Sequence, residues 1–369
     1  MTYLIPIKYA TLIFPLIAFI FTMPFILRQY HKYGSISIFK STITYLFIFY
    51  LICAYFLVIL PLPKISEVAQ LTTPRTQLIP FSFIKDFINE TTLDITNPST
   101  YISALKQSCF YVVAFNIILT IPFGIMLRYY FKCNLKKTCL YTFILSLFFE
   151  LTQLSGLYFI YPRGYRLFDV DDLILNTLGG LLGYIIISPF LKIVPPIEDV
   201  NNKAKIKGQT ISGLRRTVAV ALDIFILLLI QTLTIIIFRN NFYLNILIAL
   251  IYYFIIPIFL NTSTIGEKYL NIQILDYNDN KNIPRLILRK LLFILIYIIT
   301  PYLISLLITS LPNTYLREFI GLIIILIMLL AYFITGIKFL FSSKDLLYEK
   351  LSKTKRVSTI KPDNELNTE

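Results

Sequence analysis

The sequence has little of the side-chain chemistry on which soluble enzymes depend. Its 369 residues include no Trp, one His and four Cys, and only 15% of them are charged, against about 25% in an average soluble domain. The single His31 lies in a polar segment, and the four cysteines form no C-x-x-C pair. We therefore expect no disulfide framework, no metal site, no cofactor and no histidine-based catalysis.

The residues that are present favour a chain that lies in a membrane. Hydrophobic residues make up 57% of the sequence, including 31 Phe and 26 Tyr, and the mean hydropathy is +0.73. A formal net charge of +14 would suggest nucleic acid as the partner of a soluble protein. Here it indicates basic loops instead, so we expect an integral, multi-pass protein of the cell membrane and no nucleic-acid partner.

Long apolar stretches predict the membrane-spanning helices. A spanning helix needs about 20 mostly apolar residues. The stretches that qualify lie at about 9–27, 42–60, 108–127, 138–161, 173–191, 217–238, 243–261, 291–310 and 318–341. The expected fold class is therefore all-α, a polytopic helical bundle with about nine spans.

The basic residues predict the orientation of these spans. With the N-terminus outside, the inside segments carry 25 of the 34 Lys and Arg residues. Because cytoplasmic loops are enriched in Lys and Arg, the C-terminus should then be cytoplasmic. A Pro-containing, Asn- and Lys-rich segment divides the spans into five and four. The expected parts are a membrane domain over 1–195, a cytoplasmic linker over 196–214, a second membrane domain over 215–342 and a cytoplasmic tail over 343–369.

Polar side chains gather near the predicted outer ends of the first five spans. Glu150 and Gln153 share one helical face, and Asp169, Asp172 and Asn176 continue one stripe into the next helix. Carboxylates within the membrane are costly and mark functional sites by default. The candidate ligand-binding residues are Arg75, Asn116, Glu150, Gln153, Arg166, Asp169, Asp172 and Asn176. The alternative is that the acids pair with Arg75 and Arg166 only to hold the helices together.

These motifs resemble the VanZ-like family. The resemblance rests on the I-P-F run at 79–81 after Arg75, on the stretch 116–124, on the pair at 150 and 153, and on the run 166–179, and it covers about residues 5–195. Some VanZ-like proteins are linked to resistance to the glycopeptide teicoplanin, so the resemblance implies a role at the bacterial cell envelope.

A second polar group is expected at the cytoplasmic side of the later spans. It comprises Arg216, Asp223, Asp276 and Arg289, and residues 270–275 alternate in a way that predicts a short strand or hairpin. This arrangement resembles the RDD family over about 210–342. That family is often linked to transport. The alternative is that Asp223 pairs with Arg216 or Arg289 and joins the helices.

Three functions remain open at this point. The favoured one is a non-catalytic envelope protein, without catalytic residues, that lowers susceptibility to a lipoglycopeptide such as teicoplanin by binding a lipid head group or a lipid-linked cell-wall intermediate. The second is a transporter of a small ligand or ion. The third is a membrane enzyme acting on lipid-linked precursors, in which paired carboxylates would transfer protons.

Overall fold

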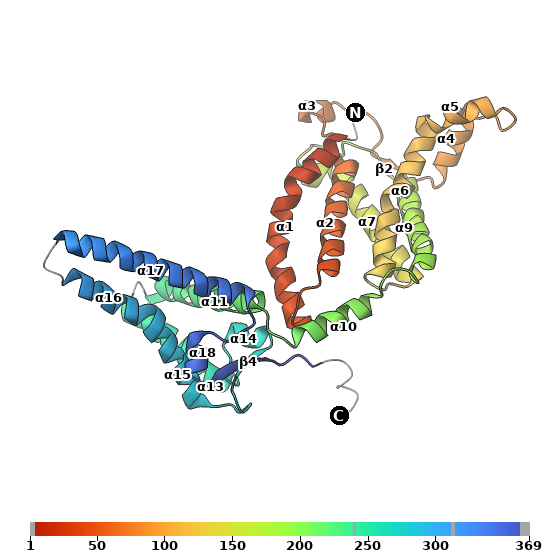
Figure 1. The fold of residues 1–369 in the computed structure, drawn as a ribbon. Helices are drawn as coiled ribbons and strands as arrows, with labels where there is room; N and C mark the ends of the chain where they lie inside the picture. Colours follow the sequence, from red (N-terminus) through yellow and green to blue (C-terminus); the bar gives the residue numbers. More distant parts are fainter. Residues whose placement is uncertain (1–3, 239–240, 311–313, 362–369) are drawn as a thin grey trace. The chain divides into compact units, whose positions relative to one another are not determined.

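The computed structural model of the chain is mostly helical (Figure 1) and describes residues 4–238, 241–310 and 314–361. In that part of the chain, eight helices are long and apolar enough to cross a membrane. They are Ile5–Tyr33, Ile38–Ile59, Ser108–Tyr129, Val170–Phe190, Gly213–Phe238, Phe242–Phe259, Ile283–Thr309 and Arg317–Phe341. The chain is thus a polytopic helical membrane protein.

The one predicted span that is missing from these eight is the fourth in chain order, 138–161, which corresponds to α7, Leu135–Leu154. It is long enough to cross a membrane, but its charged and polar side chains make it less apolar than the other eight. The helix also ends before the predicted limit at residue 161. Gly156 has a φ of +65°, and the three residues after it are left-handed as well, so the short helix α8 (Gly156–Phe159) does not continue α7.

The contacts divide the chain into two units. Unit 1 comprises Met1–Ile20 and Ile38–Asp199, and unit 2 comprises Phe21–Ser37 and Val200–Glu369. The long first helix α1 (Leu4–Tyr33) therefore contributes to both units, as does α10 (Ile197–Gly208) in the predicted linker.

Unit 1 is built on α2, α6, α7 and α9 together with the first part of α1 (Figure 1). Short elements connect them at one end of the bundle, and β1 pairs in parallel with β2. The bounds are α2 Ile38–Ile59, α3 Ile65–Ala69, β1 Thr76–Gln77, α4 Ser82–Glu90, η1 Pro98–Thr100, α5 Tyr101–Leu105, α6 Ser108–Tyr129, β2 Phe168–Asp169 and α9 Val170–Phe190.

Glycines bring α6 and α9 into close contact. A Cβ on Gly179 would collide with the carbonyl of Ile117, and one on Gly183 with the carbonyl of Ile121. Small residues four positions apart let two membrane helices approach at backbone distance. This packing fixes the polar N-terminal part of α9 against α6.

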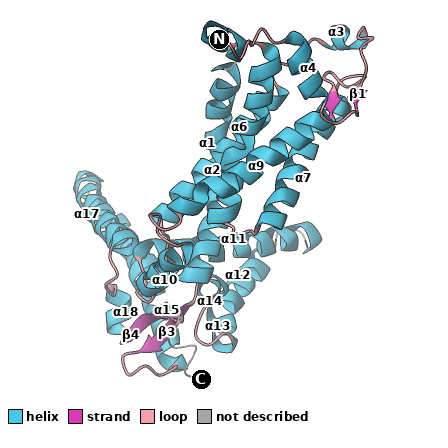
Figure 2. Cartoon of the chain, turned by 90° about the vertical axis from the view of Figure 1, so that its right-hand side faces the viewer, coloured by secondary structure: helices cyan, strands magenta, loops and turns pink. Residues whose placement is uncertain are grey.

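Unit 2 contains the last four of the eight spanning helices. It also contains a two-stranded antiparallel sheet, β3 with β4 (Figure 2). Two of the spanning helices are interrupted by a π-helical turn, Ile251–Ile255 and Leu295–Ile299. The remaining bounds are α11 Gly213–Phe238, α12 Phe242–Leu250, α13 Ile256–Phe259, α14 Ile265–Tyr269, β3 Ile272–Asp276, α15 Ile283–Ile294, α16 Thr300–Thr309, α17 Thr314–Phe341, α18 Leu347–Leu351 and β4 Thr354–Ser358.

The sheet carries the alternation that the sequence predicts. Ile272 and Ile274 on β3 are buried, with intermediate residues between them. Ile272 packs with Leu270, Tyr30 and Val218 in the core of unit 2. The predicted strand at 270–275 is confirmed as β3.

The segment expected as a cytoplasmic tail supplies the second strand of this sheet. Residues 354–358 form β4, which pairs with the whole of β3, and α18 precedes it. The sequence of β4, Thr-Lys-Arg-Val-Ser, contains one apolar residue, so hydrophobic alternation does not predict a strand there.

Candidate functional site

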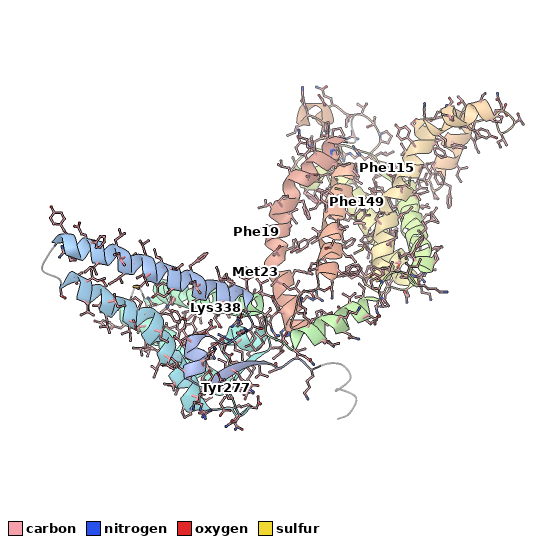
Figure 3. The ribbon with its side chains drawn as sticks, viewed as in Figure 1. Phe19, Met23, Phe115, Phe149, Tyr277 and Lys338 are labelled. Atoms are coloured by element: carbon pink, nitrogen blue, oxygen red, sulfur yellow. The ribbon has the colours of Figure 1, made fainter. Side chains whose placement is uncertain are left out.

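Unit 1 encloses a cavity of about 370 Å³ between its helices. Phe115 of α6 and Phe149 of α7, both labelled in Figure 3, form part of its apolar wall. Six of the eight residues predicted for the outer site also line it. These are Asn116, Glu150, Gln153, Arg166, Asp172 and Asn176.

The cavity lies toward one end of the bundle. At 1.5 Å per residue, Asn116 lies about 12 Å from the start of α6 and Glu150 about 6 Å from the end of α7. Asp172 lies about 3 Å from the start of α9 on the same measure. The predicted orientation makes this the outer end, so the polar groups would lie in the outer part of the bilayer.

Two buried carboxylates dominate the polar wall. Glu150 is 2% exposed, and its Oε2 accepts a hydrogen bond from the backbone N–H of Asp169 at 3.0 Å. Oδ1 of Asp172 accepts a hydrogen bond from the side-chain amide of Asn116. Among the described residues, Oε1 of Glu150 and Oδ2 of Asp172 accept no hydrogen bond. The two acids thus keep free acceptor capacity toward the cavity.

Asn176 adds another acceptor. Its Nδ2 donates to Oγ of Ser146 at 2.9 Å, and its backbone carbonyl accepts from the hydroxyl of Thr120 at 2.6 Å. Its side-chain oxygen is buried without a hydrogen-bond partner in the described part of the chain. Because an unpaired buried polar atom is costly, this oxygen is expected to meet a partner from outside the protein.

Arg166 and Gln153 attach the cavity wall to the end of α2. Arg166 donates to the carbonyls of Val58 at 2.7 Å and Leu60 at 2.8 Å. Gln153 donates to the same carbonyl of Val58 at 3.1 Å. These carbonyls lie at or beyond the last turn of α2, where no further helical N–H is available. No ion pair joins Arg166 to either acid among the described residues, so the arginine acts here as a helix cap.

Arg75 and Asp169 lie beside the cavity and do not line it. The side chain of Arg75 is exposed, and only its backbone carbonyl reaches the site, by accepting a hydrogen bond from the N–H of Phe168 at 3.0 Å. Oδ1 of Asp169 caps α9 by accepting from the N–H of Asp171 at 2.8 Å. Burial raises the pKa of Asp169 above its ordinary value.

Sequence reasoning missed Asp171 as an organising residue. It is 2% exposed and accepts hydrogen bonds from the N–H of Phe81 at 2.6 Å, from the hydroxyl of Ser82 at 2.6 Å and from the N–H of Phe83 at 3.0 Å. It therefore fixes the N-terminus of α4 against α9. Asp171 is adjacent to Asp172 in the sequence, but it does not share the helical face of Asp169, Asp172 and Asn176, from which the site was predicted.

In unit 2 the predicted polar residues have separate partners. Asp223 accepts hydrogen bonds from the hydroxyl of Tyr252 at 2.6 Å, the hydroxyl of Thr264 at 2.6 Å and the N–H of Gly266 at 2.7 Å. The expected pairing of Asp223 with Arg216 or Arg289 is not among the described ion pairs, because these neutral donors already surround the carboxylate.

The two arginines and Asp276 serve other elements. Arg216 donates to the carbonyl of Ser342, and Arg289 forms an ion pair with Glu349. Asp276 ends β3 and accepts from the N–H groups of Asn278 and Asn280, each at 2.9 Å. These backbone hydrogen bonds, with that from Asn280 foremost, lower the pKa of Asp276.

Glu349 forms the centre of the most charged cluster in unit 2. Its side chain is fully buried and forms ion pairs with Arg289 and Arg356. Burial opposes ionisation, but the two arginines outweigh it and hold the pKa of Glu349 below its ordinary value. The sequence does not predict the ion pair of Arg289 with Glu349, because two helices, α16 and α17, separate Arg289 from the segment that was expected to be a tail.

Residues 47–192 match the VanZ/LLP1 family. The match begins within α2, extends past the end of α9 and includes all eight residues predicted for the outer site. It is shorter than the expected 5–195, and the comparison gives no support for an RDD domain. No curated protein and no solved structure matches the chain. In the described part of the chain, no three His, Cys, Asp or Glu side chains are placed to hold a metal.

Proposed function

We propose that unit 1 binds the polar head group of a lipid, or of a lipid-linked cell-wall intermediate, in the cavity between α2, α6, α7 and α9. The unpaired oxygens of Glu150, Asp172 and Asn176 carry this proposal. They supply several acceptors at one place within an apolar bundle, which helix packing alone does not require. The location would be the outer leaflet of the cell membrane.

The charge of the cavity refines the kind of head group that fits. Its acceptors outnumber its donors, because Arg166 directs two N–H groups at the carbonyls of Val58 and Leu60. Arg75, which a phosphate would favour, is exposed and does not line the cavity. A head group rich in hydroxyl, amide or ammonium donors, such as a sugar or an amino group, is therefore the better match.

We favour binding over turnover because of what lines the cavity. Among the described lining residues, no Ser, Cys, Lys or His accompanies the two carboxylates. A protein that holds such a head group could reduce the access of a lipoglycopeptide such as teicoplanin to its target. The resemblance to VanZ-like proteins and the match to VanZ/LLP1 support an envelope role of this kind.

Native mass spectrometry of the purified full chain tests the proposal. We expect the wild type to retain a defined lipid from bacterial membranes, and Asp172→Asn to retain it at least about tenfold less, since a hydrogen bond to a charged group contributes about 1.5–3 kcal/mol. Asp199→Asn removes an exposed carboxylate of α10 and serves as the matched control.

Drug susceptibility of cells that express the same variants forms the second readout. Asp172→Asn should abolish any protection against teicoplanin at unchanged protein level in the membrane, and Asp199→Asn should preserve it. Equal lipid retention by the wild type and Asp172→Asn would overturn the proposal.

A further inference from the structure

Unit 2 holds a second cavity, of about 440 Å³, that no part of the proposed function uses. It lies between α17 and the helix formed by the π-helical turn Leu295–Ile299 and α16, and α18 closes one end. Ile296, Ile304, Met328 and Ala331 line its apolar part. Lys338, Asp345 and Lys350 line the other end.

A proline explains why these helices leave a space. Pro301 has no N–H to donate to the carbonyl of Tyr297, four residues earlier, and a proline inside a helix kinks it or breaks its hydrogen-bond ladder. The π-helical turn ends at Ile299, two residues before Pro301. The carbonyl of Tyr297 instead accepts a hydrogen bond from the hydroxyl of Tyr332 on α17 at 3.3 Å. The space between the helices thus follows from the sequence, and the hydrogen bond between Tyr332 and Tyr297 connects its two walls.

The cavity has the length and the polarity of one lipid chain with its head group. Met328 and Lys338 lie ten residues apart on α17, which is about 15 Å along a helix axis. That is half of a bilayer core of about 30 Å. The side chains of Lys338, labelled in Figure 3, and Lys350 are exposed, and neither forms an ion pair among the described residues.

The charge at this end favours an anion. The two lysines line this end together with a single carboxylate, Asp345, where α17 leaves the predicted membrane. The predicted orientation places this end at the cytoplasm, whose leaflet carries anionic lipids. Basic pockets between spanning helices on that side bind the head groups of such lipids.

We propose that this cavity binds an anionic phospholipid of the cytoplasmic leaflet. One acyl chain lies along Ile296, Ile304 and Met328, and the phosphate lies between the ammonium groups of Lys338 and Lys350. The proposal does not depend on the cavity in unit 1, because every residue that it uses belongs to unit 2.

The test equilibrates the delipidated full chain with a defined mixture of phosphatidylglycerol and phosphatidylcholine and counts bound lipids by native mass spectrometry. The wild type should prefer phosphatidylglycerol, and the double variant Lys338→Gln/Lys350→Gln should lose that preference by about 10- to 30-fold, since each basic residue near an anionic membrane surface contributes a factor of about 5. The matched control is Lys203→Gln/Lys207→Gln, which removes two exposed lysines of α10.

A further variant separates a lipid from a free phosphate. Ala331→Trp fills the apolar part and leaves both lysines in place, so it should also reduce retention of phosphatidylglycerol. If glycerol 1-phosphate competes fully and Ala331→Trp has no effect, the site takes only a soluble phosphate and the proposal fails. It also fails if the α10 control loses the preference as strongly as the Lys338/Lys350 variant does.

Discussion

The buried acids that line the cavity of unit 1 differ in their partners from the buried acids of unit 2. In unit 2, Asp223 accepts three hydrogen bonds and Glu349 forms two ion pairs. In unit 1, Glu150 accepts one hydrogen bond, and one oxygen of Asp172 accepts none among the described residues. A fully partnered acid stabilises a fold, whereas one with free oxygens beside a cavity has capacity left for a ligand. The comparison therefore assigns a structural role to Asp223 and Glu349, as to the fully partnered Asp171 of unit 1, and a ligand-binding role to Glu150 and Asp172.

The largest expected effect tests this difference with two buried glutamates. Glu349→Gln should destabilise unit 2 by about 3–5 kcal/mol, because it leaves Arg289 and Arg356 as buried charges without their partner. Glu150→Gln should change the stability of unit 1 by less than about 1.5 kcal/mol, since a glutamine oxygen still accepts from the N–H of Asp169. Hydrogen exchange of the amides of β3, β4 and α9 in the intact chain measures both effects.

A matched control limits the interpretation of this experiment. Asp279→Asn removes the ion pair with Lys355, in which the Asp279 side chain is 65% exposed. Exposed pairs contribute about 0–1 kcal/mol, so this variant should leave exchange nearly unchanged. If Glu150→Gln destabilises unit 1 as much as Glu349→Gln destabilises unit 2, the distinction between the two units is wrong.

A smaller effect concerns packing in place of charge. Gly179→Ala should destabilise the contact of α6 with α9 by about 1–3 kcal/mol, because the added Cβ overpacks against the carbonyl of Ile117. Gly336→Ala is the control in unit 2, where a Cβ would meet no atom within 4 Å. That change should stabilise α17 by about 0.5–1 kcal/mol through helix propensity. Thermal unfolding in detergent measures the sign of the stability change for each variant. If only Gly336→Ala destabilises the protein, the proposed close packing at Gly179 is wrong.

The smallest expected effect is a loss of stability of unit 2 at acidic pH. Because the pKa of Glu349 in the folded protein lies below its ordinary value of 4.5, its ion pairs contribute fully above pH 4.5. That contribution is lost as the pH falls through the lowered pKa. Protection factors at β3 and β4, which correct for the intrinsic pH dependence of amide exchange, should therefore fall below pH 4.5 in the wild type, and much less in Glu349→Gln. An equal acid response in both would show that Glu349 is not the titrating group.

The sequence predicts the parts of this molecule that depend on local pattern. Apolar runs of about 20 residues identify the eight spanning helices, and the spacing of Asp172 and Asn176 anticipates one face of α9. The cavity brings together six residues that the sequence proposed as one site. The predicted end of the fourth span fails, because the left-handed backbone from Gly156 onward stops the helix.

Other features depend on contacts between residues far apart in the chain, which local sequence patterns do not predict. Arg75 was expected to reach the acids, yet Asp171 makes the contacts that hold the loop at 81–83. Arg166 was expected to face the carboxylates, and it caps α2 instead. The ion pairs of Glu349 involve a segment that composition marks as a polar tail. In each case the choice of partner follows from tertiary packing.

The pairing of β3 with β4 has a consequence for the order in which the chain matures. β3 is synthesised before α15, α16, α17 and α18, and its only described strand partner follows all four of them. During that interval the edge of β3 carries unpaired backbone groups, which makes it a template for wrong pairing. The nascent protein therefore passes through a stage in which its spanning helices can already be inserted but β3 has not yet paired with β4.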